Sequence, residues 1–98
     1  MKLVWTRWAL EDRRAIFDYI ETDDPRVAAM VDDRIAAATR RLIDFPNSGR
    51  PGRVESTREL VIARTSYIAP YRIEGDVVRI LRIIHGARIW PDAIPDET

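Results

Sequence analysis

Hydrophobic and polar residues alternate most clearly near the C-terminal end of the chain, between residues 67 and 91. In the second half of this stretch, one face carries Val77, Arg79, Leu81, Ile83 and His85, and the other carries Val78, Ile80, Arg82 and Ile84. This period of two predicts a β-strand over residues 77–85. The Gly75-Asp76 pair before it is typical of a two-residue hairpin, because glycine adopts the positive φ of a type II′ turn at little steric cost. We therefore predict a hairpin that joins strands 67–74 and 77–85.

Two shorter apolar runs predict the remaining strands. Residues 2–5 form a first strand, and residues 58–64 form another whose Leu60 and Ile62 face one way. The strand over residues 67–74 contains Pro70, which has no backbone N–H to donate to a ladder and therefore predicts an edge position or a bulge. A loop rich in proline and glycine over residues 45–53 separates these strands from the region before it.

Between the first strand and that loop, the spacing of apolar residues is helical. Thr6 is placed to cap a helix over residues 7–21. Asp24 and Pro25 then suit the N-cap and the first position of a second helix. Its apolar residues recur at alternate spacings of three and four, which predicts a buried seam of Ala28, Val31, Ile35, Ala38, Leu42 and Phe45. The short link between the helices predicts an antiparallel helical hairpin.

The elements follow one another in the order β-α-α-β-β-β. We predict an α+β fold, a mostly antiparallel sheet with the helical hairpin packed on one face, as a single domain over residues 1–98. With 46% hydrophobic and 33% charged residues, the chain has the composition of a soluble globular protein. No apolar run approaches the roughly 20 residues that span a bilayer, and the start resembles no signal peptide. We therefore expect a cytoplasmic protein without membrane contact.

Charge is balanced overall but not along the chain. The formal net charge is zero, yet residues 46–91 hold twice as many basic as acidic side chains. All the basic residues there are arginines: Arg50, Arg53, Arg58, Arg64, Arg72, Arg79, Arg82 and Arg88. Arginine presents a planar fork that suits phosphate or carboxylate. The alternative is that these side chains only make the strand faces soluble, in a chain whose basic residues are almost all arginines.

The residues that could carry chemistry lie mainly on the predicted strands. His85 could exchange a proton with a ribose hydroxyl or a leaving oxygen, or it could be a structural histidine bonded to a nearby carbonyl. Four arginines on one sheet would make a cationic surface for phosphate, with Tyr67, Tyr71 or Trp90 available to stack on a base; these are Arg64, Arg72, Arg82 and Arg88. A chain with one histidine and no cysteine predicts no metal site, and nothing predicts a cofactor.

Two segments resemble a known family. GRPGRVESTRELVI and YRIEGDVVRILRIIHGARIWP look like the corresponding parts of the RelE/ParE superfamily of toxins from type II toxin–antitoxin systems. The order β-α-α-β-β-β matches the fold of that family over nearly the whole chain. The resemblance implies one of two activities. RelE-like members are ribosome-dependent endoribonucleases that cut mRNA, whereas ParE-like members share the fold and inhibit DNA gyrase.

The resemblance implies different residues for the two activities. In a RelE-like toxin, His85, Arg64 and Arg88 would be catalytic. This chain lacks the lysine-rich segment of the nucleases, has no net positive charge and ends in an acidic tail, whereas a protein that grips RNA usually carries a basic excess. We therefore favour a ParE-like, non-enzymatic gyrase inhibitor of the kind that stabilises plasmids. Its surface for target or antitoxin would be formed by Arg72, Arg82, Arg88 and Trp90.

A third reading is an inactive remnant retained for antitoxin binding and repression of its operon. All three readings imply a cognate antitoxin and therefore a hetero-oligomer. The groove between the helix pair and the sheet is expected to accept a C-terminal segment of the antitoxin. We expect Arg72 and Arg82 to pair there with acidic residues of the antitoxin.

Overall fold

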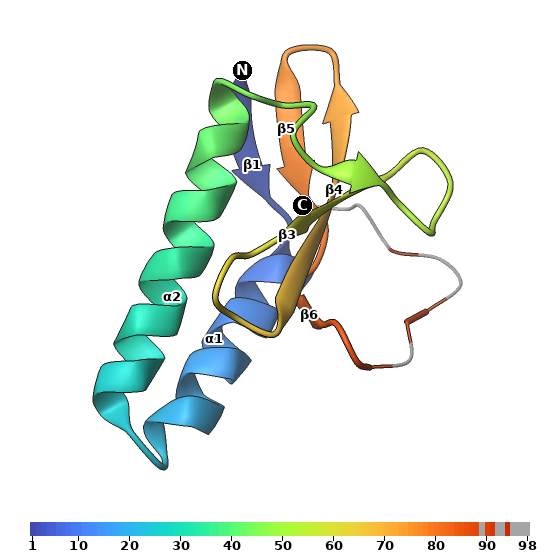
Figure 1. The fold of residues 1–98 in the computed structure, drawn as a ribbon. Helices are drawn as coiled ribbons and strands as arrows, with labels where there is room; N and C mark the ends of the chain where they lie inside the picture. The colour runs from blue at the N-terminus through green and yellow to red at the C-terminus, as the bar shows by residue number, and fades with distance from the viewer. Residues whose placement is uncertain (89, 92–93, 95–98) are drawn as a thin grey trace.

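The chain forms two layers, a pair of helices and a six-stranded sheet (Figure 1). The computed structural model describes residues 1–88, 90, 91 and 94. The elements are β1 (Lys2–Trp5), α1 (Arg7–Glu21), α2 (Pro25–Arg40), the 3-10 turn η1 (Arg41–Ile43), β2 (Arg50–Pro51), β3 (Arg58–Val61), β4 (Tyr67–Glu74), β5 (Val77–Ile80) and β6 (Ile84–His85). The predicted α+β class is confirmed, and the short strands β2 and β6 extend the predicted order.

The sheet is mixed but mostly antiparallel. Its strand order is β1-β5-β4-β3-β2, and β6 also pairs with β4. The N-terminal strand β1 runs parallel to β5, with Leu3 opposite Val78, whereas every other pairing in the described part of the chain is antiparallel. The hairpin between β4 and β5 turns at Gly75, whose φ of 60° is the left-handed conformation that the sequence predicted there.

Side-chain caps fix where both helices begin. The hydroxyl of Thr6 accepts a hydrogen bond from the Ala9 backbone N–H at 3.1 Å and donates one to the Leu81 carbonyl at 2.8 Å. The carboxylate of Asp24 accepts from the N–H groups of Arg26 and Val27, with Pro25 in the first helical turn. Both predicted caps are confirmed, because each satisfies amides that have no partner within the helix.

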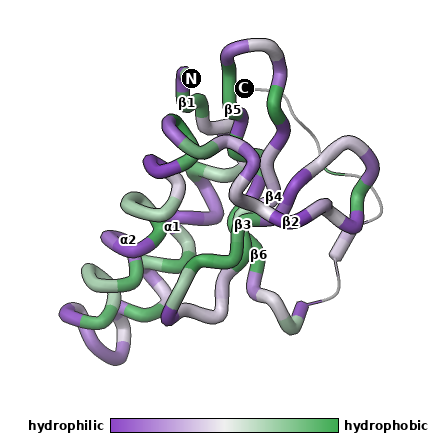
Figure 2. Tube along the Cα trace, turned by 45° about the horizontal axis from the view of Figure 1, so that its top comes forward, coloured by the Kyte–Doolittle hydropathy of each residue, from purple (hydrophilic) through white to green (hydrophobic). Residues whose placement is uncertain are grey.

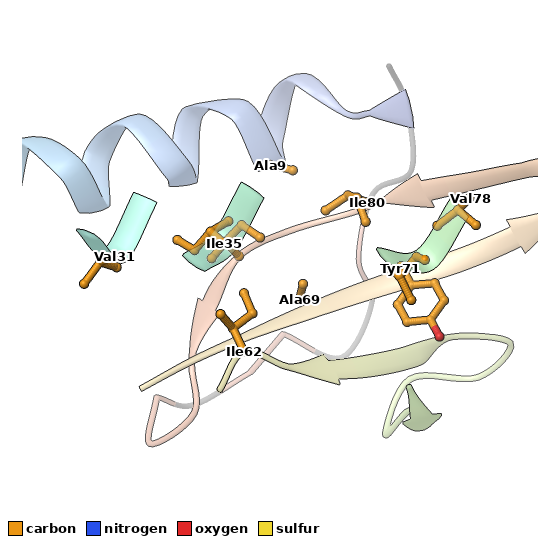
Figure 3. Packing of buried hydrophobic residues seen from close by; sticks show 10 residues of the cluster. Ala9, Val31, Ile35, Ile62, Ala69, Tyr71, Val78 and Ile80 are labelled. Atoms are coloured by element: carbon orange, nitrogen blue, oxygen red, sulfur yellow. The ribbon is translucent and has the colours of Figure 1, made fainter. Parts of the chain in front are cut away.

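The core lies between the helix pair and the inner face of the sheet. In Figure 3, Val31 and Ile35 of α2 meet Ile62 and Ala69 from the side of the strands, and these four side chains are at most 8% exposed. Along both helices, hydrophilic and hydrophobic residues alternate in the manner of amphipathic helices (Figure 2). Burial of one stripe from each helix against the sheet therefore holds the two layers together.

The predicted seam of α2 is wrong at its last position. Ala28, Val31, Ile35 and Leu42 are buried as expected, but Phe45 is 59% exposed. The α-helix ends at Arg40 and continues as a 3-10 turn, which has three residues per turn rather than 3.6. This change of period rotates the following residues away from the stripe that the α-helical spacing predicts.

The predicted strand over residues 77–85 is interrupted. It divides into β5 and β6, and Leu81–Ile83 between them are outside any strand. Pro70 of β4 lies opposite this break: its carbonyl accepts from the Leu81 N–H at 2.9 Å, but it has no N–H to return. Of the two alternatives predicted for Pro70, the edge position is wrong, since β4 is central in the sheet. The predicted irregularity is present, but in the facing strand, where three residues, 81–83, lie opposite Ala69 and Pro70. The predicted strand over residues 58–64 is likewise shorter and ends at Val61.

Candidate functional site

A groove of about 600 Å³ lies between α1 and the end of the sheet that β6 forms. Ala15, Ile16 and Tyr19 line it from α1, and Tyr67 lines it from β4. On the side of β6 it is lined by Ile83, His85, Ala87 and Arg88. The groove thus brings together His85 and Arg88, two of the candidate residues that the sequence indicated, in a mainly apolar and aromatic setting.

His85 is held from two directions. It lies opposite Tyr67 in the pairing of β6 with β4, and the two rings meet edge to face with centroids 5.5 Å apart. Its Nδ1 accepts a hydrogen bond from the Ala87 backbone N–H at 3.1 Å. An accepting Nδ1 places the proton of the neutral imidazole on Nε2. His85 is therefore oriented as a donor through Nε2, and its side chain is exposed.

Tyr67 supplies the second polar group of the groove. Burial raises the pKa of its hydroxyl. Repulsion from the ionised form of Tyr19 raises this pKa further, and the positive charge of Arg88 lowers it. The hydroxyl is therefore neutral at physiological pH and available as a hydrogen-bond donor. Together with His85 it could hold an oxygen of a bound partner.

Arg88 follows β6 in a tight turn closed by a hydrogen bond from its own N–H to the His85 carbonyl at 3.0 Å. It lies beyond the strands, as expected for a residue after the predicted strand over residues 77–85. Its side chain is exposed, and no ion pair to it is found within the described residues. Arg88 is therefore a cation available to a partner at the mouth of the groove.

Arg64 also lies outside the strands, in the turn between β3 and β4. Its backbone has a φ of 62°, which is unusual for a residue other than glycine, and its carbonyl accepts from Arg34 Nη1 at 3.0 Å. The next part of the turn contacts the β6 region, since the Ser66 carbonyl accepts from the Gly86 N–H at 2.8 Å. Arg64 is therefore carried by a turn at the same end of β4 as His85.

Arg82 is already paired within the chain. Its guanidinium binds both carboxylate oxygens of Asp12 in α1, at 2.6 and 3.0 Å, and Asp12 also accepts from the Ile83 N–H at 3.0 Å. The hydrogen bond to Asp12 raises the pKa of Arg82 against the opposing effect of burial. Arg82 lies in the break between β5 and β6, not on the predicted strand, and it fixes α1 to the sheet.

Arg72 lies toward the other end of β4, away from the groove. In the pairing with β5 it stands opposite Arg79, which binds Glu74 at 2.7 Å. Its Nε is 3.5 Å from the Ser56 carbonyl. The four candidate arginines therefore form no single cationic surface: Arg64 and Arg88 lie at one end of β4, Arg82 is bound to α1, and Arg72 lies on the strand's far half.

A buried carboxylate that the sequence analysis missed organises the GRPGR loop. Glu59 of β3 is 2% exposed and binds Arg50 at 3.1 Å and Arg53 at 3.0 Å, and it also accepts from the Arg53 backbone N–H. Burial opposes ionisation of Glu59, but these hydrogen bonds outweigh it and lower its pKa. The useful signal was one acid on a short strand that follows two loop arginines at spacings of six and nine residues.

Trp90 joins this cluster from the C-terminal side. The Arg53 guanidinium stacks 3.8 Å from the centroid of its indole ring. The Nε1 of Trp90 is buried and has no hydrogen-bond partner in the part of the chain that the structure describes. Trp90 and Arg88 both line a second, smaller hollow with Arg82. Trp90 is thus attached to the loop of residues 50–53 and does not line the larger groove.

Other kinds of site find no support in the described residues. None of the histidine, aspartate and glutamate side chains there gather in a group of three that could hold a metal ion. No helix in the same part of the chain is both long and apolar enough to cross a membrane.

Comparison with known proteins identifies the family of this chain. Residues 3–90 match the family model described as the ParE toxin of the type II toxin–antitoxin system parDE. The chain is 48% identical over 93 residues to the putative toxin Y4kP of Sinorhizobium fredii, covering 95% of this chain and 96% of that one. It is 36% identical over 88 residues to the toxin RelE2 of Caulobacter vibrioides, covering 90% and 98%.

A solved structure supports the same assignment. The chromosomal ParDE toxin–antitoxin system from P. aeruginosa contains a chain that matches with a TM-score of 0.78 and 34% identity, over 87% of this chain and 95% of that chain. The match covers both layers of the fold, and the family model covers the groove and the arginine cluster around Glu59. The chain belongs to the ParE toxin family, within the RelE/ParE superfamily of type II toxins.

Proposed function

We propose that this toxin acts as a ParE-like inhibitor of DNA gyrase and not as a nuclease. The observation that carries the proposal is how the chain uses its arginines. Five of them bind carboxylates of the same chain at 3.1 Å or less: Arg13, Arg50, Arg53, Arg79 and Arg82. A nuclease that grips RNA needs cations free for phosphates, whereas this charge-neutral chain commits a third of its fifteen arginines to its own carboxylates.

The groove supports contact with a protein better than catalysis. Its walls are mainly aliphatic and aromatic, with a few polar groups at one end, which is the composition typical of a protein-binding hot spot. Asp12, the carboxylate in the groove, is bound to Arg82 and to the Ile83 N–H, so it is not available as a general base. In this proposal Tyr19 and Tyr67 provide contact area, and Arg88 pairs with an acidic group of gyrase.

An assay of gyrase supercoiling tests this proposal. The purified toxin is expected to inhibit supercoiling and to leave cleaved DNA complexes. Replacement of Arg88 by alanine should weaken inhibition about tenfold, because a charge-assisted hydrogen bond contributes roughly 1.5–3 kcal/mol. Arg41→Ala, at an exposed arginine on the helical layer, is the matched control. No inhibition at saturating wild-type toxin would refute gyrase as the target.

A second function is supported by one specific observation, the meeting of His85, Tyr67 and Arg88 at one groove. Two relatives from Caulobacter vibrioides carry the name RelE, at 36% and 32% identity. In a ribosome-dependent nuclease, His85 would have to be protonated on both ring nitrogens, which gives up the bond that its Nδ1 accepts from the Ala87 N–H. This imidazolium would donate its Nε2 proton to the leaving oxygen and return to the neutral form, and Arg88 would hold the scissile phosphate. His85→Gln should then reduce cleavage about a hundredfold, since positioned proton transfer contributes at least that factor. Mapping of mRNA ends after induction distinguishes the two functions, because a gyrase inhibitor creates no new ends.

We also propose that the antitoxin covers the same groove, which would block either activity directly. The expected pairings of Arg72 and Arg82 with acidic residues of the antitoxin are tested separately from the groove. Arg72→Glu should weaken the complex about tenfold by placing like charges together. Arg82→Glu should weaken it as well, and it also breaks the bond to Asp12 that holds α1. Unchanged affinity of the Arg72 variant would contradict the pairing. Cytoplasmic location follows from these proposed targets.

A further inference from the structure

Helix α2 carries a second seam on its exposed side. Arg26, Met30, Asp33 and Ala37 follow one another at spacings of four, three and four, which aligns them along one face of a helix. With Ala29 and Arg34 they line a shallow hollow of about 560 Å³. Met30 is 43% exposed, although a methionine gains stability from burial. This surface, here called the outer seam, is distinct from the groove at β6.

Two positions of the outer seam carry opposite charges that form no ion pair with the described residues. Arg26 and Asp33 are seven residues apart, so they are separated by about 10 Å along the helix axis. No ion pair to either is found in the part of the chain that the structure describes, whereas Arg13 in α1 binds Asp32 at 2.6 Å. Arg34 beside them is bound within the chain, since it donates to the Arg64 carbonyl at 3.0 Å and to the sulfur of Met30 at 3.3 Å.

We infer that the outer seam binds a second copy of this chain, with the two α2 helices antiparallel. A twofold axis near residues 29 and 30 places Arg26 of each copy opposite Asp33 of the other, so one contact occurs twice. The same register sets the long Met30 side chain against the small Ala29 of the second copy, and small residues permit close approach of two helices. The charge pattern is thus complementary to itself, which favours a second copy over an unrelated partner.

A charge exchange tests the pairing. The free toxin should sediment as a monomer in equilibrium with a dimer as its concentration rises. Arg26→Glu should raise the dimer dissociation constant about tenfold. The new carboxylate at position 26 of each copy would face Asp33 of the other copy, so the repulsion occurs twice. Asp33→Arg alone should do the same, and the two substitutions combined should restore the wild-type constant. A glutamate in the first turn favours the helix, so a loss of dimer would not reflect unfolding.

Arg14→Glu, on the exposed side of α1, is the matched control and should leave the dimer unchanged. Single cysteines test the register, since the natural chain has none. Ala29→Cys should form a disulfide-linked dimer on oxidation, whereas Ala37→Cys, on the same face but far from the axis, should not. Three outcomes would overturn the proposal. The toxin could stay monomeric at every concentration, the double exchange could fail to restore the dimer, or the outer seam could be shielded only when the antitoxin is bound.

Discussion

At the scale of residues, much of the polar chemistry serves the structure of the chain itself. Glu59 holds two loop arginines, and Tyr71, which is fully buried, donates through its hydroxyl to the Pro46 carbonyl at 2.6 Å and accepts from the Gly49 N–H at 3.0 Å. The Tyr71 side chain comes so close to Gly49 that a Cβ there would lie 2.6 Å from its ring. The loop that carries the family motif is therefore built around two buried polar side chains.

Removal of the Tyr71 hydroxyl is expected to destabilise the fold. Tyr71→Phe leaves the Gly49 N–H and the Pro46 carbonyl without their partner, which costs about 1–3 kcal/mol. The measurement is the free energy of unfolding in urea. Tyr19→Phe, at a residue that is 77% exposed, is the control and should change it little. Equal effects of the two substitutions would mean that the bonds to the loop add no stability.

Glu59 should make stability depend on pH in acid. Its pKa in the folded chain is below that of the unfolded chain, about 4.3. The stabilisation is therefore complete above pH 4.3 and is lost as the pH falls through the lower folded value. Glu59→Gln should be less stable than wild type at neutral pH, and the difference should narrow below about pH 4. Thermal unfolding as a function of pH checks this, with the exposed Glu55→Gln as control; a constant difference would contradict it.

At the scale of elements, the sequence predicted what depends on local signals. Both helix starts were correct because Thr6 and Asp24 cap amides a few residues away. The turn at Gly75 was predicted correctly because it depends only on the positive φ that glycine adopts there. The error at Phe45 arose because the helical period changes in the 3-10 turn after α2. The error at residues 81–83 arose because these residues lie opposite Pro70 of another strand. Alternation along one strand contains no information about its neighbour.

The cap of α2 offers a test at this scale. Asp24→Ala removes the acceptor for the N–H groups of Arg26 and Val27 and should cost about 1 kcal/mol. The adjacent exposed Asp23→Ala is a closely matched control, since no cap bond involves its side chain. Denaturant unfolding of the two variants gives the comparison. If Asp23→Ala were as destabilising, general charge and not capping would explain the effect.

At the scale of the whole molecule, one ion pair joins the helical layer to the sheet. Arg82 and Asp12 are 70 residues apart in the chain, and this separation explains why the sequence assigned Arg82 to a partner's surface and left Asp12 unmentioned. The site was predicted in part for the same reason. His85 and Arg88 are neighbours along the chain and were found together, whereas the α1 wall with Tyr19 is defined only by the packing of distant segments.

Loss of Asp12 should therefore affect the whole fold. Asp12→Ala leaves a half-buried arginine and the Ile83 N–H unpaired, which we expect to cost about 2–4 kcal/mol. Asp18→Ala breaks only an exposed contact with Arg14 at 3.9 Å and should cost under 1 kcal/mol. Calorimetric unfolding measures both. A small loss in the Asp12 variant would show that apolar packing alone holds the layers together.

The pairing of β1 with β5 has a consequence for synthesis of the toxin. Within the described residues, β1 pairs with a single strand, β5, at residues 77–80. On the ribosome, the helical hairpin can form early from local contacts, but the N-terminal strand must wait until nearly the whole chain has emerged. The sheet, and with it the groove beside β6, is therefore completed only after residues 77–88 have emerged from the ribosome. A chain cut short before β5 would lack the partner of β1 and the β6 side of the groove, so the toxin's surface depends on synthesis of residues 77–88.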